Sequence, residues 1–159
     1  MSGLLWEDVW EWFDLDLNGT LPDVHVPGTT AEDWRSLLEL VKSERWQWTY
    51  LIGAEPAEPP AAVEDMLLRQ RDDESVSLKV WPVPGVLAIF RPHDPERIDF
   101  DVDLRELQGQ QQLDLLCQFF TLIGRKLRKP VLMTPEGSGN DPVLGYDVAA
   151  DRVIVLAGE

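Results

Sequence analysis

The segment from Ile98 to Arg105, IDFDVDLR, constrains the fold more than any other stretch of this 159-residue chain. Apolar residues occupy every second position, and charged residues fill the positions between them. Because successive side chains of a strand point to opposite faces of a sheet, this pattern predicts a strand with one buried face and one face in water. Strands of this kind are typical of antiparallel sheets. We therefore expect Asp99, Asp101 and Asp103 to line the solvent side of an antiparallel strand.

The sequence before and after this strand shows helical periodicity. The helices predicted there can cover the buried face of the strand. The strongest helix is predicted over residues 110–128, where apolar residues form one stripe and Pro130 follows the end. A second helix is predicted to begin at a capping box around Thr30 and to end near Ser43. A third is expected within residues 60–71, where the apolar stripe is shorter.

Further strands are expected where β-branched and aromatic residues are bounded by turn residues. They lie at residues 46–52, 76–80, 86–90, 131–134 and 153–157, and residues 143–146 are a further candidate. Strands joined by turns, with helices before and after them, indicate an α+β fold. The length suits a single domain over residues 1–159. We expect one mainly antiparallel sheet of about five to six strands, with helices packed against it.

The N-terminal segment is rich in tryptophan and acid. A short amphipathic helix is predicted at about residues 4–14, with Trp6 and Trp10 away from its main apolar stripe. Whether these tryptophans belong to the core or to the surface stays open from the sequence. The prolines and glycines of residues 18–28 predict an irregular connection, and the Pro- and Ala-rich residues 53–62 predict a flexible loop.

Charge is the global property that narrows the function most. The chain has 29 acidic and 14 basic residues, a net charge of -15, which argues against nucleic acid as a partner. The first basic residue is Arg35, and eight acids precede it. Such a field speeds encounter with a basic protein, so we expect a partner of that kind. The alternative is that the acidity only keeps the protein in solution.

The sequence also bears on the compartment. No apolar run approaches the roughly eighteen residues of a membrane span, so no membrane partner is expected. The N-terminal residues are acidic where a signal peptide would be basic. Cys117 has no second cysteine with which to form a disulfide, which agrees with a reducing compartment. We expect a cytoplasmic protein.

The stretch FDLDLNGTLPDVH, Phe13 to His25, resembles two chemical signatures. Asp14, Asp16 and Asn18 match the start of a calcium-binding EF-hand loop, but the twelfth position is His25 where a bidentate carboxylate is required. The same letters resemble the phosphotransfer signature of haloacid dehalogenase-type hydrolases, with two extra residues inside it and an acidic, helical segment before it. We therefore interpret the stretch as a turn at Asn18 and Gly19.

No other group of residues predicts catalysis, a metal site or a cofactor. The two histidines, His25 and His93, stand beside prolines, and Cys117 falls on the apolar stripe of a helix, where an inert thiol is expected. One cysteine and two histidines show no zinc-ligand spacing. The segment 134–142 has glycines but lacks the lysine and the following helix of a phosphate-binding loop. We expect no enzyme activity.

Three aspartates on one strand face repel one another, because their carboxylates stand only about 7 Å apart. We expect other groups to offset this negative charge. Arg or Lys on an adjacent strand would do so, and Lys79 is available. A basic partner protein across the face would also do so, and a metal cluster is the third alternative. The candidate partner-binding residues are those of this face and of the N-terminal segment: Trp6, Trp10, Asp14, Asp16, Asp99, Asp101 and Asp103.

The C-terminal part of the chain resembles a known class of proteins. The succession IDFDVDL, LLCQFFTLIGRKLRKP, VLMTPE, PVLGYD and RVIVLAG is similar to small acidic immunity-type proteins of bacterial toxin systems, over about the last 65 residues. The resemblance implies an inhibitor that binds and blocks a basic toxin, such as a nuclease, in the cytoplasm. The alternatives are a secretion chaperone or adaptor, and a magnesium-dependent hydrolase that uses Asp14 and Asp16.

Overall fold

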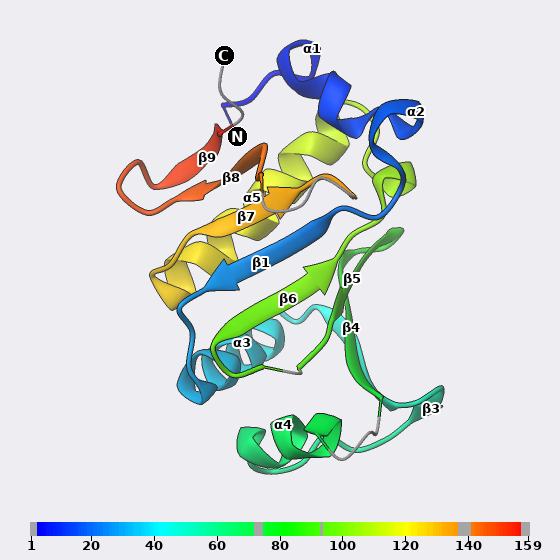
Figure 1. Ribbon diagram of the computed structural model, residues 1–159, viewed down its shortest axis with the longest axis vertical. Helices are drawn as coiled ribbons and strands as arrows, with labels where there is room; N and C mark the ends of the chain where they lie inside the picture. The colour runs from blue at the N-terminus through cyan, green and yellow to red at the C-terminus, as the bar shows by residue number, and fades with distance from the viewer. Residues whose placement is uncertain (1–2, 72–74, 93, 137–140, 157–159) are drawn as a thin grey trace.

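The computed structural model describes residues 3–71, 75–92, 94–136 and 141–156, and over this part the chain folds into one antiparallel sheet with helices (Figure 1). The strand order is β3-β2-β4-β5-β6-β1-β7-β8-β9. The elements in chain order are α1 Trp6–Val9, η1 Trp10–Phe13, α2 Leu15–Asn18, β1 Asp23–Pro27, α3 Ala31–Ser43, β2 Gln47–Ile52, β3 Glu55–Pro56, α4 Val63–Arg71, β4 Val76–Val83, β5 Val86–Phe90, β6 Arg97–Asp101, η2 Leu104–Glu106, α5 Gln110–Leu127, β7 Val131–Thr134, β8 Leu144–Asp147 and β9 Arg152–Val155.

The α+β class is confirmed, but the expectation of five to six strands is wrong, because nine strands form. The largest difference is β1, which lies between β6 and β7 where an irregular connection was predicted. The prolines of this region do not interrupt the ladder, since Pro22 precedes β1 and Pro27 is its last residue. Within the predicted loop 53–62, β3 adds a two-residue edge to β2.

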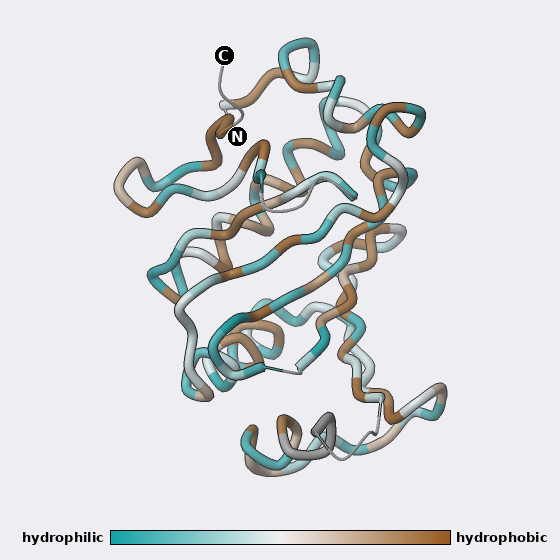
Figure 2. Tube along the Cα trace, in the orientation of Figure 1, coloured by the Kyte–Doolittle hydropathy of each residue, from teal (hydrophilic) through white to brown (hydrophobic). Residues whose placement is uncertain are grey.

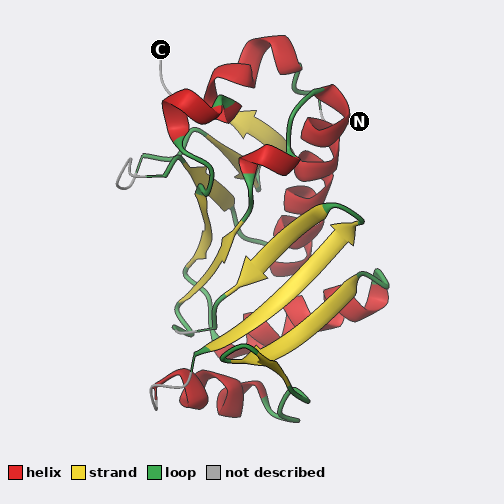
Figure 3. Ribbon diagram, turned by 90° about the vertical axis from the view of Figure 1, so that its right-hand side faces the viewer, coloured by secondary structure: helices red, strands yellow, loops and turns green. Residues whose placement is uncertain are grey.

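The buried face of the sheet is formed by alternate residues of its central strands. Val24 and Val26 of β1 and Ile98 and Phe100 of β6 are fully buried. The helices α3 and α5 cover this face, and α4 packs beside α3 and β4 (Figure 1 and Figure 3). Burying a side chain of this size stabilises the fold by about 1.5–3 kcal/mol. Among the described residues, no helix lies across the opposite face in either view.

The two long helices begin and end close to the predicted positions. At the start of α3 the capping box forms as expected, with the Thr30 amide donating to Asp33 at 3.0 Å. The helix α5 runs from Gln110 to Leu127 and ends at Arg128, whose φ of 58° is left-handed. Ion pairs from Lys126 to Glu39 and from Lys129 to Asp33 join the end of α5 to α3. None of the helices in the described ranges has the length and apolarity to cross a bilayer.

The contact between α5 and β8 depends on a glycine. Gly124 lies under the ring of Tyr146, and a Cβ at this position would be 2.1 Å from the Tyr146 Cδ2 atom. The Tyr146 hydroxyl donates to Asp151 at 2.6 Å, and the same carboxylate accepts from Arg125 at 2.7 Å. Burial and the bond to Asp151 raise the pKa of Tyr146. The ring is therefore held in place and has little freedom to move away from α5.

Replacement of this glycine tests the contact. We expect Gly124→Ala to lower the free energy of unfolding by about 1–3 kcal/mol, because the added methyl group overpacks a fixed ring. Helix propensity alone would favour alanine by about 1 kcal/mol, so the sign separates packing from propensity. Urea denaturation measures the difference, with Gln111→Ala on the exposed side of α5 as the control. A Gly124→Ala variant as stable as the parent would contradict the close packing.

Candidate functional site: the open face of the sheet

The outer face of the sheet is assembled from residues that alternate with the core. Residues opposite each other in an antiparallel ladder point to the same side, so the register defines the rows across this face. One row joins Ile89, Asp101 and Asp23, and the next joins Asp99 and His25. Figure 2 shows hydrophilic and hydrophobic residues alternating along β1 and β6. The candidate site is therefore centred on two neighbouring strands, which we call the open face.

Arginines offset two of the three carboxylates at this centre. Arg91 donates to Asp101 at 2.9 Å, and Arg97 donates to Asp99 at 2.8 Å. Asp23 lies directly opposite Asp101, and no cation in the described part of the chain is within ion-pair distance of it. Like charges in directly opposite positions destabilise a sheet. The open face thus holds one carboxylate more than its arginines neutralise.

The electrostatic environment of β1 reflects this excess. Partial burial, followed by the charges of Asp101 and Asp99, raises the pKa of Asp23 above its ordinary value, against a smaller opposing effect of Arg97. Partial burial, followed by the cation of Arg97, lowers the pKa of His25, while Asp99 and Asp23 act in the opposite direction. At neutral pH the lowered pKa leaves the His25 imidazole neutral, beside carboxylates that the two arginines offset only in part.

Asp103 does not belong to this face, which corrects the prediction of three aspartates on one strand. The strand β6 ends at Asp101, and Asp103 instead caps the 3₁₀ helix η2 by accepting from the Arg105 amide at 2.9 Å. Its carboxylate also pairs with the Arg105 guanidinium at 2.7 Å, and this hydrogen bond lowers the pKa of Asp103. The strand ends early because the chain turns toward the N-terminal segment, where the Leu104 amide donates to Thr20.

The expected neighbour of these aspartates, Lys79, is not the one that offsets them. Lys79 lies on β4, and β5 separates it from β6. The neutralising groups are Arg91, just after β5, and Arg97, on β6 itself. The general expectation of nearby basic residues is met by different side chains. The pairs to Asp99 and Asp101 have exposed guanidinium groups, so each contributes at most about 1 kcal/mol.

The N-terminal tryptophans divide between core and surface. Trp6 is half-buried, and its ring packs 5.3 Å from that of the buried Phe13. Trp10 remains 44% exposed. The predicted single helix at residues 4–14 is instead split into α1 and η1, and hydrogen bonds tie this segment to the domain: Gln108 donates to the Phe13 carbonyl and Gln110 to the Leu4 carbonyl.

Asp14 and Asp16 take part in a local cap. Asp14 is the N-cap of α2, where its carboxylate accepts from the Asp16 amide at 2.9 Å, and Asp16 is exposed. Gly19 follows α2 with a φ of 72°, which confirms the turn predicted at Asn18 and Gly19. Asp14 follows a 3₁₀ helix and not a strand, so its setting lacks the strand that the hydrolase signature requires.

The predicted partner-binding residues therefore form two separate groups. Asp99 and Asp101 lie on β6. The helix α1, which begins at Trp6, lies near the start of α5, where the Trp6 amide donates to Gln110, and Trp10 begins the following η1 (Figure 1). Glu136 stands between the two regions: it accepts from the amides of Thr20 and Leu21, and its charge contributes to the raised pKa of Asp23. The N-terminal segment thus enters the sheet next to the open face.

The described part of the chain brings together no metal or nucleophile site. A group of three or more His, Cys, Asp or Glu side chains that could hold a metal ion is not found in the ranges the structure describes. Cys117 is buried on α5, as predicted. His93 lies outside the described residues, as do residues 137–140 of the glycine-containing segment. The chemistry this face can perform is the binding of cationic groups.

Sequence reasoning missed Asp23, His25 and Glu136. For β1 a signal was present, because DVHV alternates polar and apolar residues as a half-buried strand does. The prolines at its ends masked this signal. Glu136 carries no local signal, since its role arises from hydrogen bonds to residues 20 and 21, which are distant in the sequence.

Removing the charge of Asp23 is expected to stabilise the protein at neutral pH. Because the pKa of Asp23 is raised on folding, the native state binds this proton more tightly than the unfolded state. The contribution to stability is full below the unfolded pKa and is lost as the pH rises through the folded one. We expect Asp23→Asn to raise the free energy of unfolding at pH 7 by less than about 1 kcal/mol, since the group is exposed.

The advantage of Asp23→Asn should shrink as the pH falls toward the ordinary aspartate pKa of 3.8. Urea denaturation at pH 7 and at pH 4 measures it, with Glu58→Gln in the loop after β3 as the charge-matched control. A loss of stability at pH 7 on Asp23→Asn would show that the carboxylate makes a favourable contact, in conflict with the surplus described above.

The pKa of the His25 imidazole reports the electrostatic potential at the open face. We expect its imidazole to titrate below the ordinary value of 6.5, and further below it in Asp99→Asn, because that change removes a carboxylate that raises the pKa. Proton NMR follows the titration, and a His25→Gln variant distinguishes its signal from that of His93. A midpoint above 6.5 in the parent protein would contradict the environment described.

Comparison with known proteins assigns nothing to this site. No protein-family model matches the chain, and no curated protein is detectably similar to it in sequence. The resemblance of the C-terminal part to immunity-type proteins stays a prediction.

Proposed function

We propose that this protein is a non-enzymatic binding protein that occupies the surface of a basic partner protein. The single observation that carries the proposal is the unneutralised carboxylate of Asp23, held opposite Asp101 on an uncovered sheet face. A cation supplied by a partner would reduce the repulsion between the carboxylates of Asp23 and Asp101. This reduction would add to the favourable free energy of binding. The net charge of -15 supports the same direction of attraction over longer distances.

The N-terminal segment supplies apolar anchors beside this charge. Trp10 and Leu17 are 44% and 69% exposed, and acidic residues stand close to them in the chain. Exposed Trp side chains are frequent hot spots of interfaces because they bury a large area at low entropic cost. The negative charge would speed the encounter with a basic partner. The exposed aromatic and aliphatic side chains would then stabilise the complex once it has formed.

Within this class, we favour an immunity-type inhibitor of a basic bacterial toxin such as a nuclease. A nuclease needs a basic surface to bind phosphates, and an acidic sheet face is complementary to such a surface. The resemblance of about the last 65 residues supports this choice. A secretion chaperone would instead be expected to dimerise and to hold an extended, partly unfolded segment of its partner, so size-exclusion chromatography of the complex distinguishes the two.

Neutralising the open face should abolish most of the binding. The test variant is Asp23→Asn, Asp99→Asn and Asp101→Asn together, and the control removes the same charge elsewhere through Glu55→Gln, Glu58→Gln and Asp65→Asn. After affinity capture of the partner from the source cells, the dissociation constant is measured for each variant at low and moderate salt. We expect the test variant to bind about 10- to 100-fold more weakly and with less salt dependence, and the control to stay within about threefold.

Equal losses in the two variants would show that only net charge matters, and they would remove the open face from the proposal. The activity of the captured protein is then assayed with increasing amounts of the parent chain. Complete inhibition at one chain per partner is the result expected of an immunity-type inhibitor. A partner that retains full activity when saturated would contradict inhibition while leaving binding intact.

A further inference from the structure

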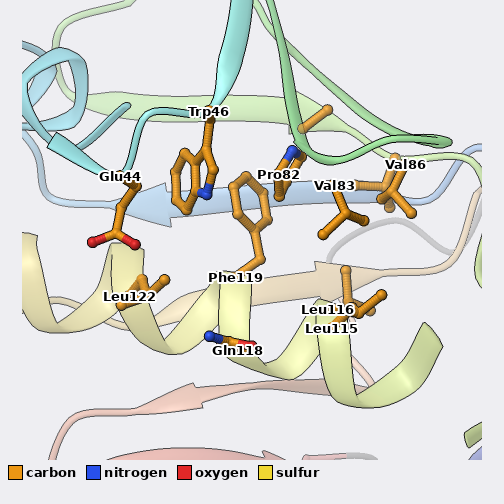
Figure 4. A pocket seen from close by; sticks show the side chains of 12 residues that line it. Glu44, Trp46, Pro82, Val83, Val86, Leu115, Leu116, Gln118, Phe119 and Leu122 are labelled. Carbon is orange, nitrogen blue, oxygen red and sulfur yellow. The ribbon is translucent and has the colours of Figure 1, made fainter. Parts of the chain in front are cut away.

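An apolar pocket lies on the other side of the sheet, between α5 and the β4–β5 hairpin (Figure 4). Its volume is about 90 Å³. Leu115 of α5 lies below Val83 and Val86 of the hairpin (Figure 4). Farther along α5, Phe119 rises beside Trp46, and Leu122 lies below Glu44. The rings of Trp46 and Phe119 meet edge to face at 5.1 Å, which fixes this wall. We call this feature the hairpin pocket.

The hairpin pocket lies at an edge of the helix layer, where α5 is packed mainly against other strands of the sheet. The main contacts of α5 are with β7, β8, β9 and α3. The helix α3 ends at Ser43, before the chain enters β2. The hairpin itself departs from regular pairing between Val80 and Val83, where the register shifts. Apolar side chains of both elements are therefore left facing a space that the chain does not fill.

The hairpin pocket is lined mainly by apolar side chains, and one side chain at its edge is charged. Among the residues that line it, only Glu44 is ionisable, and no cation lies within ion-pair distance of Glu44 over the described residues. A neighbouring hollow shares Glu44 and Trp46 with it and extends past Trp81 and Pro84, with Arg45 at its side. A ligand in the pocket would thus bury apolar atoms and would place its next group beside a carboxylate.

We propose that the hairpin pocket binds one aliphatic side chain of a partner protein, flanked in the partner's sequence by a Lys or Arg that pairs with Glu44. The proposal rests on the proposed function, since it assigns an anchor point for the same basic partner. Charge complementarity selects the flanking residue: both the rim carboxylate and the net charge of -15 favour a cation and disfavour an acid.

The size of the pocket selects the anchor. Small-molecule sites commonly enclose about 300–1,000 Å³, so a drug-sized ligand or a cofactor would not be enclosed here. A cavity of about 150 Å³ holds benzene, which leaves an aliphatic group such as a leucine side chain as the best occupant of the smaller space. Interface hot spots lie in well-packed, desolvated pockets, which is the setting that the hairpin pocket offers to one side chain.

Short peptides test this chemistry without the partner. The probe is acetyl-Gly-Lys-Leu-Lys-Gly-amide, compared with peptides in which alanine replaces the leucine or glutamates replace both lysines. Binding is followed by NMR through the Trp46 indole and the methyl groups of Val83, Leu115 and Leu122. We expect the leucine–lysine peptide to shift these signals saturably and to bind at least about threefold more tightly than either comparison peptide.

Variants locate the binding site. Val83→Phe adds bulk at the mouth of the hairpin pocket and should abolish binding of the leucine–lysine peptide. Glu44→Gln should weaken its binding by roughly two- to fivefold, the range expected for one exposed ion pair, while Glu58→Gln should change nothing. An unchanged heteronuclear spectrum outside the pocket verifies that each variant is folded.

Equal binding of the alanine peptide, or shifts confined to β1 and β6, would overturn the pocket proposal by showing attraction to charge alone. Absence of any saturable shift up to about 10 mM peptide would overturn it as well. The proposed function is tested separately, because the open-face variant leaves the hairpin pocket intact and Val83→Phe leaves the open face intact. If open-face neutralisation has no effect on partner binding but the peptide binds, the pocket stands and the open-face interface fails.

Discussion

The pairing of β1 with both β6 and β7 is the interaction on which the rest of the structure depends. Without β1, the strand order divides into two smaller sheets, one from β3 to β6 and one from β7 to β9. Its inner residues Val24 and Val26 complete the core above the helices, and its outer residues Asp23 and His25 complete the open face. A strand near the N-terminus thus joins the strands formed later in the chain into one sheet.

This central position explains why the open face carries surplus negative charge. The register of β1 against β6 brings Asp23 opposite Asp101, so a carboxylate that would be harmless in a loop is fixed beside others. Arg91 and Arg97 offset part of the repulsion, and partial burial together with the remaining repulsion raises the pKa of Asp23. An arrangement that costs stability in the free protein, and that a cationic partner would relieve, is expected of a binding surface more than of a structural one.

The sequence predicts the parts of this fold whose signals are local. The helices α3 and α5 follow from a capping box and an apolar stripe, and β6 follows from strict alternation. The features that depend on long-range contacts cannot be predicted from local sequence patterns. The prolines near β1 favoured the prediction of an irregular connection there. Asp103 lies beyond the end of β6 because the Leu104 amide donates to the Thr20 carbonyl. Asp99 and Asp101 were predicted on the outer face, whereas Asp23 and Glu136 join them only through tertiary pairing.

The most direct test of the central claim is the footprint of the partner on this chain. Backbone NMR of the isotope-labelled protein, recorded with and without its unlabelled partner, gives the residues whose signals change. A basic partner bound at the open face should perturb β1, β6 and the neighbouring N-terminal segment most strongly. Perturbations restricted to α3 and α4, with β1 and β6 unaffected, would contradict an interface on the open face.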